Sequence, residues 1–171
     1  MTTLKKFGIK DESLRNGYLT LVNAYKRKIH MQIYPMITNV LIRERDSQVE
    51  TSSKGELYTH SPGDIFKIFL EVFEVILKQP MKEVILGVLE VIHEVFSQYL
   101  RALYQMITMD RTLTFDYLVA LCNNFGKFSD QIELLVEPLS QKKDLSREEL
   151  EAAFDQRVIQ KHFGKIISKI I

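Results

Sequence analysis

Apolar side chains recur every three or four positions along most of the chain, which is the spacing of amphipathic helices. The first such stripe predicts a helix over about 11–45. Pro35 lies inside it and predicts a kink near 31–35 or two consecutive helices, because proline removes a backbone hydrogen bond and clashes with the carbonyl four residues back. The stripe consists of Leu14, Tyr18, Leu21, Val22, Tyr25, Ile29, Ile33, Ile37, Val40 and Leu41.

A polar, serine-rich segment at 46–60 is expected to form an exposed loop, and a helix over about 63–78 is expected to follow it. Three side chains mark the start of that helix. Ser61 can cap free backbone N–H groups, Pro62 suits the first helical position, and Asp64 suits the positive end of the helix dipole.

The chain after residue 80 is expected to form three more helices. The segment 81–109 is apolar on both flanks, which indicates a helix packed between neighbours. A helix over about 115–137 follows, with Asp110 or Thr114 as its cap and Pro138 at its end.

The last helix is expected to begin at a capping box formed by Ser146 and Glu149 and to run to the terminus. The sequence ends on Lys169-Ile170-Ile171 without a polar tail, so we expect a slice of a longer subunit. The whole pattern predicts an all-α fold, with residues 1–171 forming a single module.

Composition favours a globular helical protein. Apolar residues make up 46% and charged residues 26% of the chain, and seven Gly and four Pro leave little material for the turns of an all-β fold. Cys122 is the only cysteine, so an intrachain disulfide is excluded and a reducing compartment is favoured. The start of the chain lacks the apolar core of a signal peptide, and no apolar run is long enough to predict a membrane span.

Charge is distributed unevenly along the chain. Residues 1–60 carry ten Lys and Arg against six Asp and Glu, residues 61–140 carry six against eleven, and the remainder carries seven against five. An acidic middle between basic ends favours protein–protein contact, and it predicts no binding of nucleic acid, which generally needs a strong basic excess.

Catalytic and metal-binding motifs do not occur in the sequence. It contains no glycine-rich phosphate loop, no HExxH, no GxSxG and no paired cysteines, so we predict no enzyme activity, no catalytic residue, no metal site and no cofactor. Glu90 and Glu94 flank His93 and share one helix face. They are interpreted as a solvated acidic edge, with an acid–base or metal pair as the alternative.

Other candidate residues also have a structural interpretation. Cys122 is predicted to be a small buried residue and not a nucleophile. Asn123 and Asn124, in an otherwise apolar helix, predict one exposed amide and one hydrogen bond across to a neighbouring helix, with a binding site as the alternative. The basic run 26–28 could touch acidic lipid or protein, but its three cations point to different sides of a helix. The stripe of Phe66, Phe69 and Phe73 is predicted to belong to the core.

Three segments of the sequence match a known family in order and spacing. They are the long helix with Tyr18, Tyr25 and Ile42-Arg43-Glu44, the run Gly55-Glu56-Leu57-Tyr58-Thr59-His60-Ser61-Pro62-Gly63-Asp64-Ile65-Phe66, and the run Tyr117-Leu118-Val119-Ala120-Leu121-Cys122-Asn123-Asn124-Phe125. Over roughly residues 14–139 the chain resembles the exocyst complex component 3 (Sec-six) family of vesicle-tethering subunits. Tyr34-Pro35 departs from the family, which tends to carry a tryptophan there.

The resemblance implies an all-α fold of antiparallel helical bundles stacked as a rod, the architecture of multisubunit tethers. It also implies docking of secretory vesicles at the plasma membrane, with other exocyst subunits and SNARE proteins as partners. The expected location is cytoplasmic, and peripheral at plasma-membrane sites of secretion through the complex. Two alternatives stay open: an unrelated helical scaffold or adaptor, and a small helical enzyme or carrier with a pocket between helices.

Overall fold

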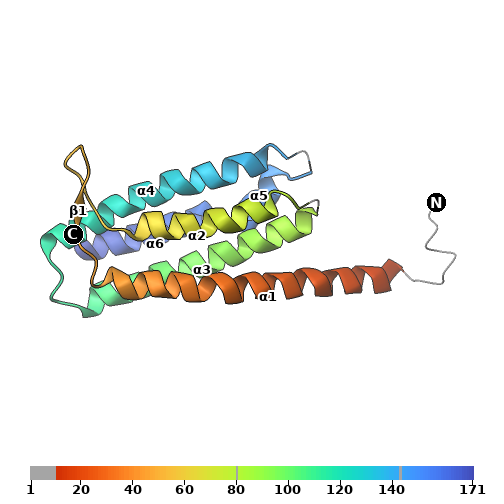
Figure 1. Ribbon diagram of the computed structural model, residues 1–171, viewed down its shortest axis with the longest axis horizontal. Helices are drawn as coiled ribbons and strands as arrows, with labels where there is room; N and C mark the ends of the chain where they lie inside the picture. Colours follow the sequence, from red (N-terminus) through yellow and green to blue (C-terminus); the bar gives the residue numbers. More distant parts are fainter. Residues whose placement is uncertain (1–10, 80, 143) are drawn as a thin grey trace.

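The computed structural model describes residues 11–79, 81–142 and 144–171. In these ranges the protein is predominantly helical, which confirms the predicted all-α fold (Figure 1). The elements are α1 (Asp11–Glu44), β1 (Glu50–Thr51), β2 (Leu57–Tyr58), α2 (Ser61–Ile76), α3 (Lys82–Met109), α4 (Phe115–Ser140), α5 (Arg147–Ala153) and α6 (Gln156–Ile170).

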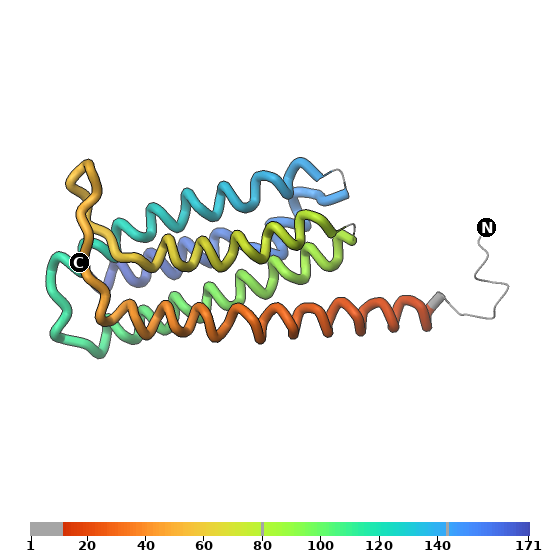
Figure 2. Tube along the Cα trace, viewed as in Figure 1, coloured from red at the N-terminus to blue at the C-terminus, as the bar shows by residue number. Residues whose placement is uncertain are grey.

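The long helices lie side by side along the long axis of the molecule, and consecutive long helices run in opposite directions (Figures 1 and 2). α3 contacts α1, α2, α5 and α6, which confirms the prediction that it packs between neighbours. The N-terminal part of α1 extends beyond the end of the bundle (Figure 2). α1 approaches α3 closely at Gly87, where an added Cβ would lie 3.0 Å from the Lys26 side chain.

The centre of the core is an aromatic cluster around Phe96 of α3. The Phe96 ring contacts the rings of Phe69 from α2, Phe128 from α4 and Phe163 from α6, so a single side chain joins four helices. Phe69 and Phe73 are buried, and Phe66 packs against the core, as predicted for this stripe. Burial of these large apolar side chains is the main force that holds the bundle together.

The two-helix alternative for the first segment is wrong, because α1 runs as one helix through Pro35. Pro35 lies on the exposed side of α1, and Met31, whose carbonyl would have accepted the missing hydrogen bond, is 75% exposed. Water can therefore satisfy that carbonyl, and the helix tolerates the proline. Leu14 and Leu21 of the predicted stripe are exposed, whereas its later members such as Ile33 are buried.

The segment predicted as an exposed loop instead contains a short hairpin. β1 and β2 pair antiparallel, with Glu50 opposite Tyr58 and Thr51 opposite Leu57. Gly55 closes the connection with a φ of 81°, a value that glycine adopts without steric cost. The segment is not exposed throughout, since Thr59 is buried.

One predicted helix cap is wrong, and one of the two alternatives for another is confirmed. His60, and not Ser61, precedes α2, and it makes no capping hydrogen bond with its side chain. Ser61 is buried as the first residue of the helix. Of the two candidates for α4, Thr114 is the cap and accepts a hydrogen bond from the backbone N–H of Tyr117.

The C-terminal part of the chain departs from prediction at two points. Pro138 lies inside α4, which continues to Ser140. The capping box of Ser146 and Glu149 is present, but the helix that it starts ends at Ala153. A new helix begins after Asp155, whose side chain accepts a hydrogen bond from the backbone N–H of Arg157. The predicted single last helix is therefore two helices, α5 and α6.

Candidate functional site

Four buried side chains meet where α1 ends, and we call Glu44, Thr59, Tyr117 and Asn124 the polar junction. Glu44 Oε1 accepts hydrogen bonds from Thr59 Oγ1 at 2.8 Å and Tyr117 Oη at 3.3 Å. Asn124 Oδ1 accepts from the backbone N–H of Thr59 at 3.2 Å, and its Nδ2 donates to Thr59 Oγ1 at 2.8 Å. The residue after the hairpin is thereby fixed to both α1 and α4.

The electrostatics of the polar junction are unusual because Glu44 is fully buried and no cation pairs with it among the described residues. Burial raises the pKa of the Glu44 carboxyl, and the hydrogen bonds from Thr59 and Tyr117 offset only part of that rise. Burial, followed by the charge of Glu44, raises the pKa of the Tyr117 hydroxyl. The polar junction therefore favours the neutral forms of the Glu44 carboxyl and the Tyr117 hydroxyl, and its hydrogen bonds hold the hairpin region to α1 and α4.

The adjacent asparagines both bind the hairpin region, so the prediction of one exposed amide is wrong. Asn123 is half-buried, and its Nδ2 donates to the backbone carbonyl of Leu57 at 2.9 Å. Asn124 bonds to Thr59 and not to a side chain of a neighbouring helix. The three segments that carried the family resemblance thus touch one another, through Glu44, Thr59 and Asn124.

His93 and the acidic pair around it contact different partners. Glu90 accepts from Lys26 Nζ, and Glu94 accepts from Gln98. The His93 ring packs edge-on against Phe154 and bonds through Nε2 to the backbone carbonyl of Asp155 at 3.3 Å. In the described ranges, no three His, Cys, Asp or Glu side chains gather to hold a metal ion.

The remaining sequence candidates are also separated in space. Cys122 is half-buried, and burial raises the pKa of its thiol, which disfavours the nucleophilic thiolate. Lys26 pairs with Glu90 on α3, whereas Arg27 and Lys28 are exposed. The basic run therefore does not form one cationic site.

A surface groove of about 1110 Å³ lies between α4 and the α5–α6 break, and we call it the α4–α5 groove. Asp130, Glu133, Leu134 and Glu137 line its α4 wall at positions i, i+3, i+4 and i+7, which share one helix face. The facing wall contains Arg147, Leu150, Glu151, Phe154, Asp155 and Arg157.

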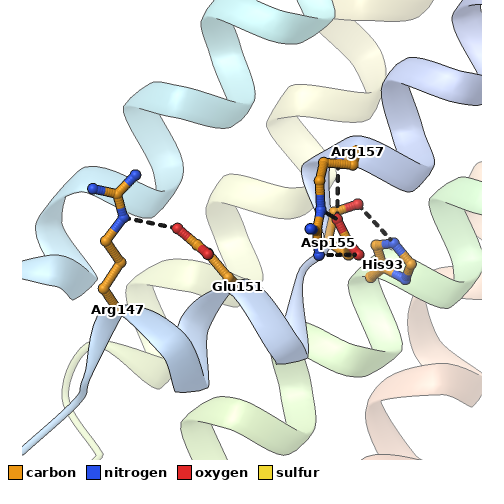
Figure 3. Close-up of polar contacts among 5 residues, drawn as sticks. All are labelled: His93, Arg147, Glu151, Asp155 and Arg157. Atoms are coloured by element: carbon orange, nitrogen blue, oxygen red, sulfur yellow. Dashed lines mark hydrogen bonds and ion pairs between the residues drawn. The ribbon is translucent and has the colours of Figure 1, made fainter.

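The charges of this facing wall are paired internally (Figure 3). Arg147 Nε lies 2.7 Å from Glu151 Oε1. Arg157 binds Asp155 with two hydrogen bonds of 3.0 Å, and these bonds lower the pKa of the Asp155 carboxyl. The groove was missed in the sequence because it depends on the break between α5 and α6. The signal that could have predicted the break is Asp155, a favoured N-cap residue.

No helix in the described part of the chain is both long and apolar enough to cross a membrane. Fold and surface together define an all-α helical-bundle domain. A family model described as "Exocyst complex component Sec6" matches residues 11–171, and the chain belongs to this family. The resemblance seen in the sequence is thereby confirmed.

A solved structure supports the fold assignment. The crystal structure of the C-terminal domain of the exocyst subunit Sec6p matches with a TM-score of 0.70 at 15% sequence identity, over 95% of this chain. The match spans 47% of that chain, so the present sequence covers about half of that structure. No curated protein matches the sequence significantly.

Proposed function

We propose that this chain is part of a non-enzymatic subunit of the exocyst, and that it acts by protein–protein contact in docking secretory vesicles at the plasma membrane. The observation that carries the proposal is the family match over residues 11–171. The partners are other exocyst subunits and SNARE proteins. Membrane association is peripheral and occurs through the complex at sites of secretion.

The surface of α1 supports a role in binding other proteins. Several large apolar side chains on this helix face solvent, including Leu21 at 61%, Met31 at 75% and Ile42 at 64% exposure. Exposed apolar side chains gain free energy when another protein covers them. The described parts of residues 1–171 form a single bundle, which fits one module of a longer, rod-shaped subunit.

The test is affinity purification of the tagged chain from cell lysate, with bound proteins quantified by mass spectrometry. We expect enrichment of other exocyst subunits over a tag-only control. A matched variant, Leu100→Asp, places a charge at a fully buried position of α3 and should abolish both the helical circular dichroism signal and the enrichment. If the folded chain enriches no exocyst subunit, the proposed tethering role of this segment is wrong.

A further inference from the structure

We infer that the α4–α5 groove is a docking site for a basic amphipathic helix of a partner protein. The inference goes beyond the tethering role, because it rests on the shape and charge of the groove and not on family membership. Its three supports are the length of the α4 wall, the apolar surface within the groove and the acidic side chains on its edge that pair with no described residue.

The shape of the groove suits a helix. Its α4 wall extends from Asp130 to Ser140, a length of about 15 Å or roughly three turns at the helical rise of 1.5 Å per residue. The facing wall presents Arg147, Leu150 and Glu151 of α5 at i, i+3 and i+4, followed by Phe154, which lies directly after the last residue of α5. A helix that docks between two helical walls uses side chains with this spacing.

Apolar surface is present at the base and on the edge of the groove. Leu150 and Phe154 line it and are themselves buried, so they form a packed floor. Leu134 lies on the α4 wall and is 62% exposed. An apolar face of a partner helix would cover Leu134 and remove its side chain from water.

The charge of the groove selects a basic partner. Asp130, Glu133 and Glu137 form no ion pair with any described residue, whereas Arg147 and Arg157 are already paired with acids of their own wall. The excess charge of the groove is therefore negative. Lys or Arg side chains on the edges of a docked helix would neutralise it.

Two lysines close to the groove in sequence are directed elsewhere. Lys127 Nζ lies 3.1 Å from the centre of the Tyr58 ring, a cation–π contact with the hairpin. Lys142 Nζ donates to the backbone carbonyls of Leu77 and Gln79 after α2. Neither lysine forms an ion pair with an acid of the α4 wall.

The experiment measures binding of a fluorescent Leu/Lys amphipathic peptide of about 15 residues to the purified chain by anisotropy. A helix of that length spans about 22 Å and covers the groove. We expect Glu133→Lys/Glu137→Lys to weaken binding about tenfold, because two attractive charges become repulsive. The same peptide with Glu in place of Lys should not bind the wild-type chain.

A matched charge control is Glu71→Lys/Glu74→Lys. These two exposed glutamates lie on α2, outside the groove, and the substitution changes the net charge by the same amount. We expect this variant to bind the peptide within about twofold of wild type. Equal weakening by both double variants would show diffuse charge attraction and would overturn the proposal.

The apolar contribution is tested at high salt, where surface charge is screened. Leu134→Ala should then weaken binding several-fold, and circular dichroism should be unchanged because the side chain is largely exposed. An unchanged affinity would overturn the proposed apolar contact. The peptide assay does not require exocyst subunits, so its failure is distinguishable from failure of the purification experiment.

Discussion

The polar junction and the α4–α5 groove use glutamate in opposite ways. Glu44 of the junction is fully buried and accepts two hydrogen bonds from neighbouring elements. Glu133 and Glu137 of the groove are exposed and pair with no described residue. The two regions lie toward opposite ends of the bundle, the junction near the hairpin and the groove beside α5 (Figure 1).

This difference indicates that the polar junction has a structural role, whereas the α4–α5 groove is a surface available for binding. Of the buried side-chain oxygens and nitrogens in the junction, Glu44 Oε2 is the one without a hydrogen-bond partner among the described residues. The other groups would lose their partners on unfolding, so the junction fixes the position of the hairpin relative to α1 and α4. Glu133 and Glu137 of the groove lose no such partner among the described residues on unfolding. Substitutions should therefore affect stability strongly at the junction and weakly at the groove.

The largest expected effect is that of Asn124→Ala. It removes both bonds to Thr59 and leaves the backbone N–H of this buried residue without its partner, while the Thr59 hydroxyl keeps only its bond to Glu44. We expect the free energy of unfolding to fall by about 3 kcal/mol, measured by urea denaturation.

The neighbouring residue provides the control for this variant. Asn123→Ala removes one bond at a half-buried position, to the carbonyl of Leu57, and should cost about 1 kcal/mol. Equal losses in the two variants would contradict the interpretation that burial makes the Asn124 bonds important.

A smaller, pH-dependent effect is expected for Glu44→Gln. The unfolded carboxyl titrates near 4.5, and its pKa in the folded protein is raised. Below pH 4.5 the carboxyl is protonated in both states and does not reduce the free energy of unfolding. As pH rises through the folded pKa, the buried carboxyl must ionise, and the free energy of unfolding falls. The free energy of unfolding of wild type relative to the Gln variant should fall as pH increases from 4.5.

This comparison with the Gln variant removes the contributions of other groups that titrate in the same range. The side chains of His60 and Asp64 act on the Glu44 pKa in opposite directions and are present in both proteins. The measurement is urea denaturation of both proteins at a series of pH values. A difference that rises with pH would mean that the hydrogen bonds outweigh burial.

The sequence predicted the junction and the groove to different extents for a physical reason. Helix periodicity predicted the long helices and the core stripe of Phe69 and Phe73, because burial of one face repeats locally along the chain. The motif around Thr59 and the pair Asn123-Asn124 were noticed, but their contact joins residues 65 positions apart and has no local signature. Predicting the groove would also have required predicting the helix break at Asp155. The apolar pattern continues through the break, and its only local signal is Asp155, a favoured N-cap residue that starts the new helix α6.

The smallest expected effect has the opposite sign and concerns the groove itself. Glu133 and Glu137 are like charges at i and i+4 near the C-terminal end of α4, where the helix dipole disfavours carboxylates. Glu133→Gln/Glu137→Gln should therefore raise the free energy of unfolding by about 0.5 kcal/mol at low salt, and less at high salt. The control Glu148→Gln, in the first turn of α5 where a carboxylate is favourable, should lower it by a few tenths of a kcal/mol, roughly. A loss of stability in the double variant would show that the groove acids support the fold. A gain would show that Glu133 and Glu137 reduce stability, which is expected of side chains that serve binding and not folding.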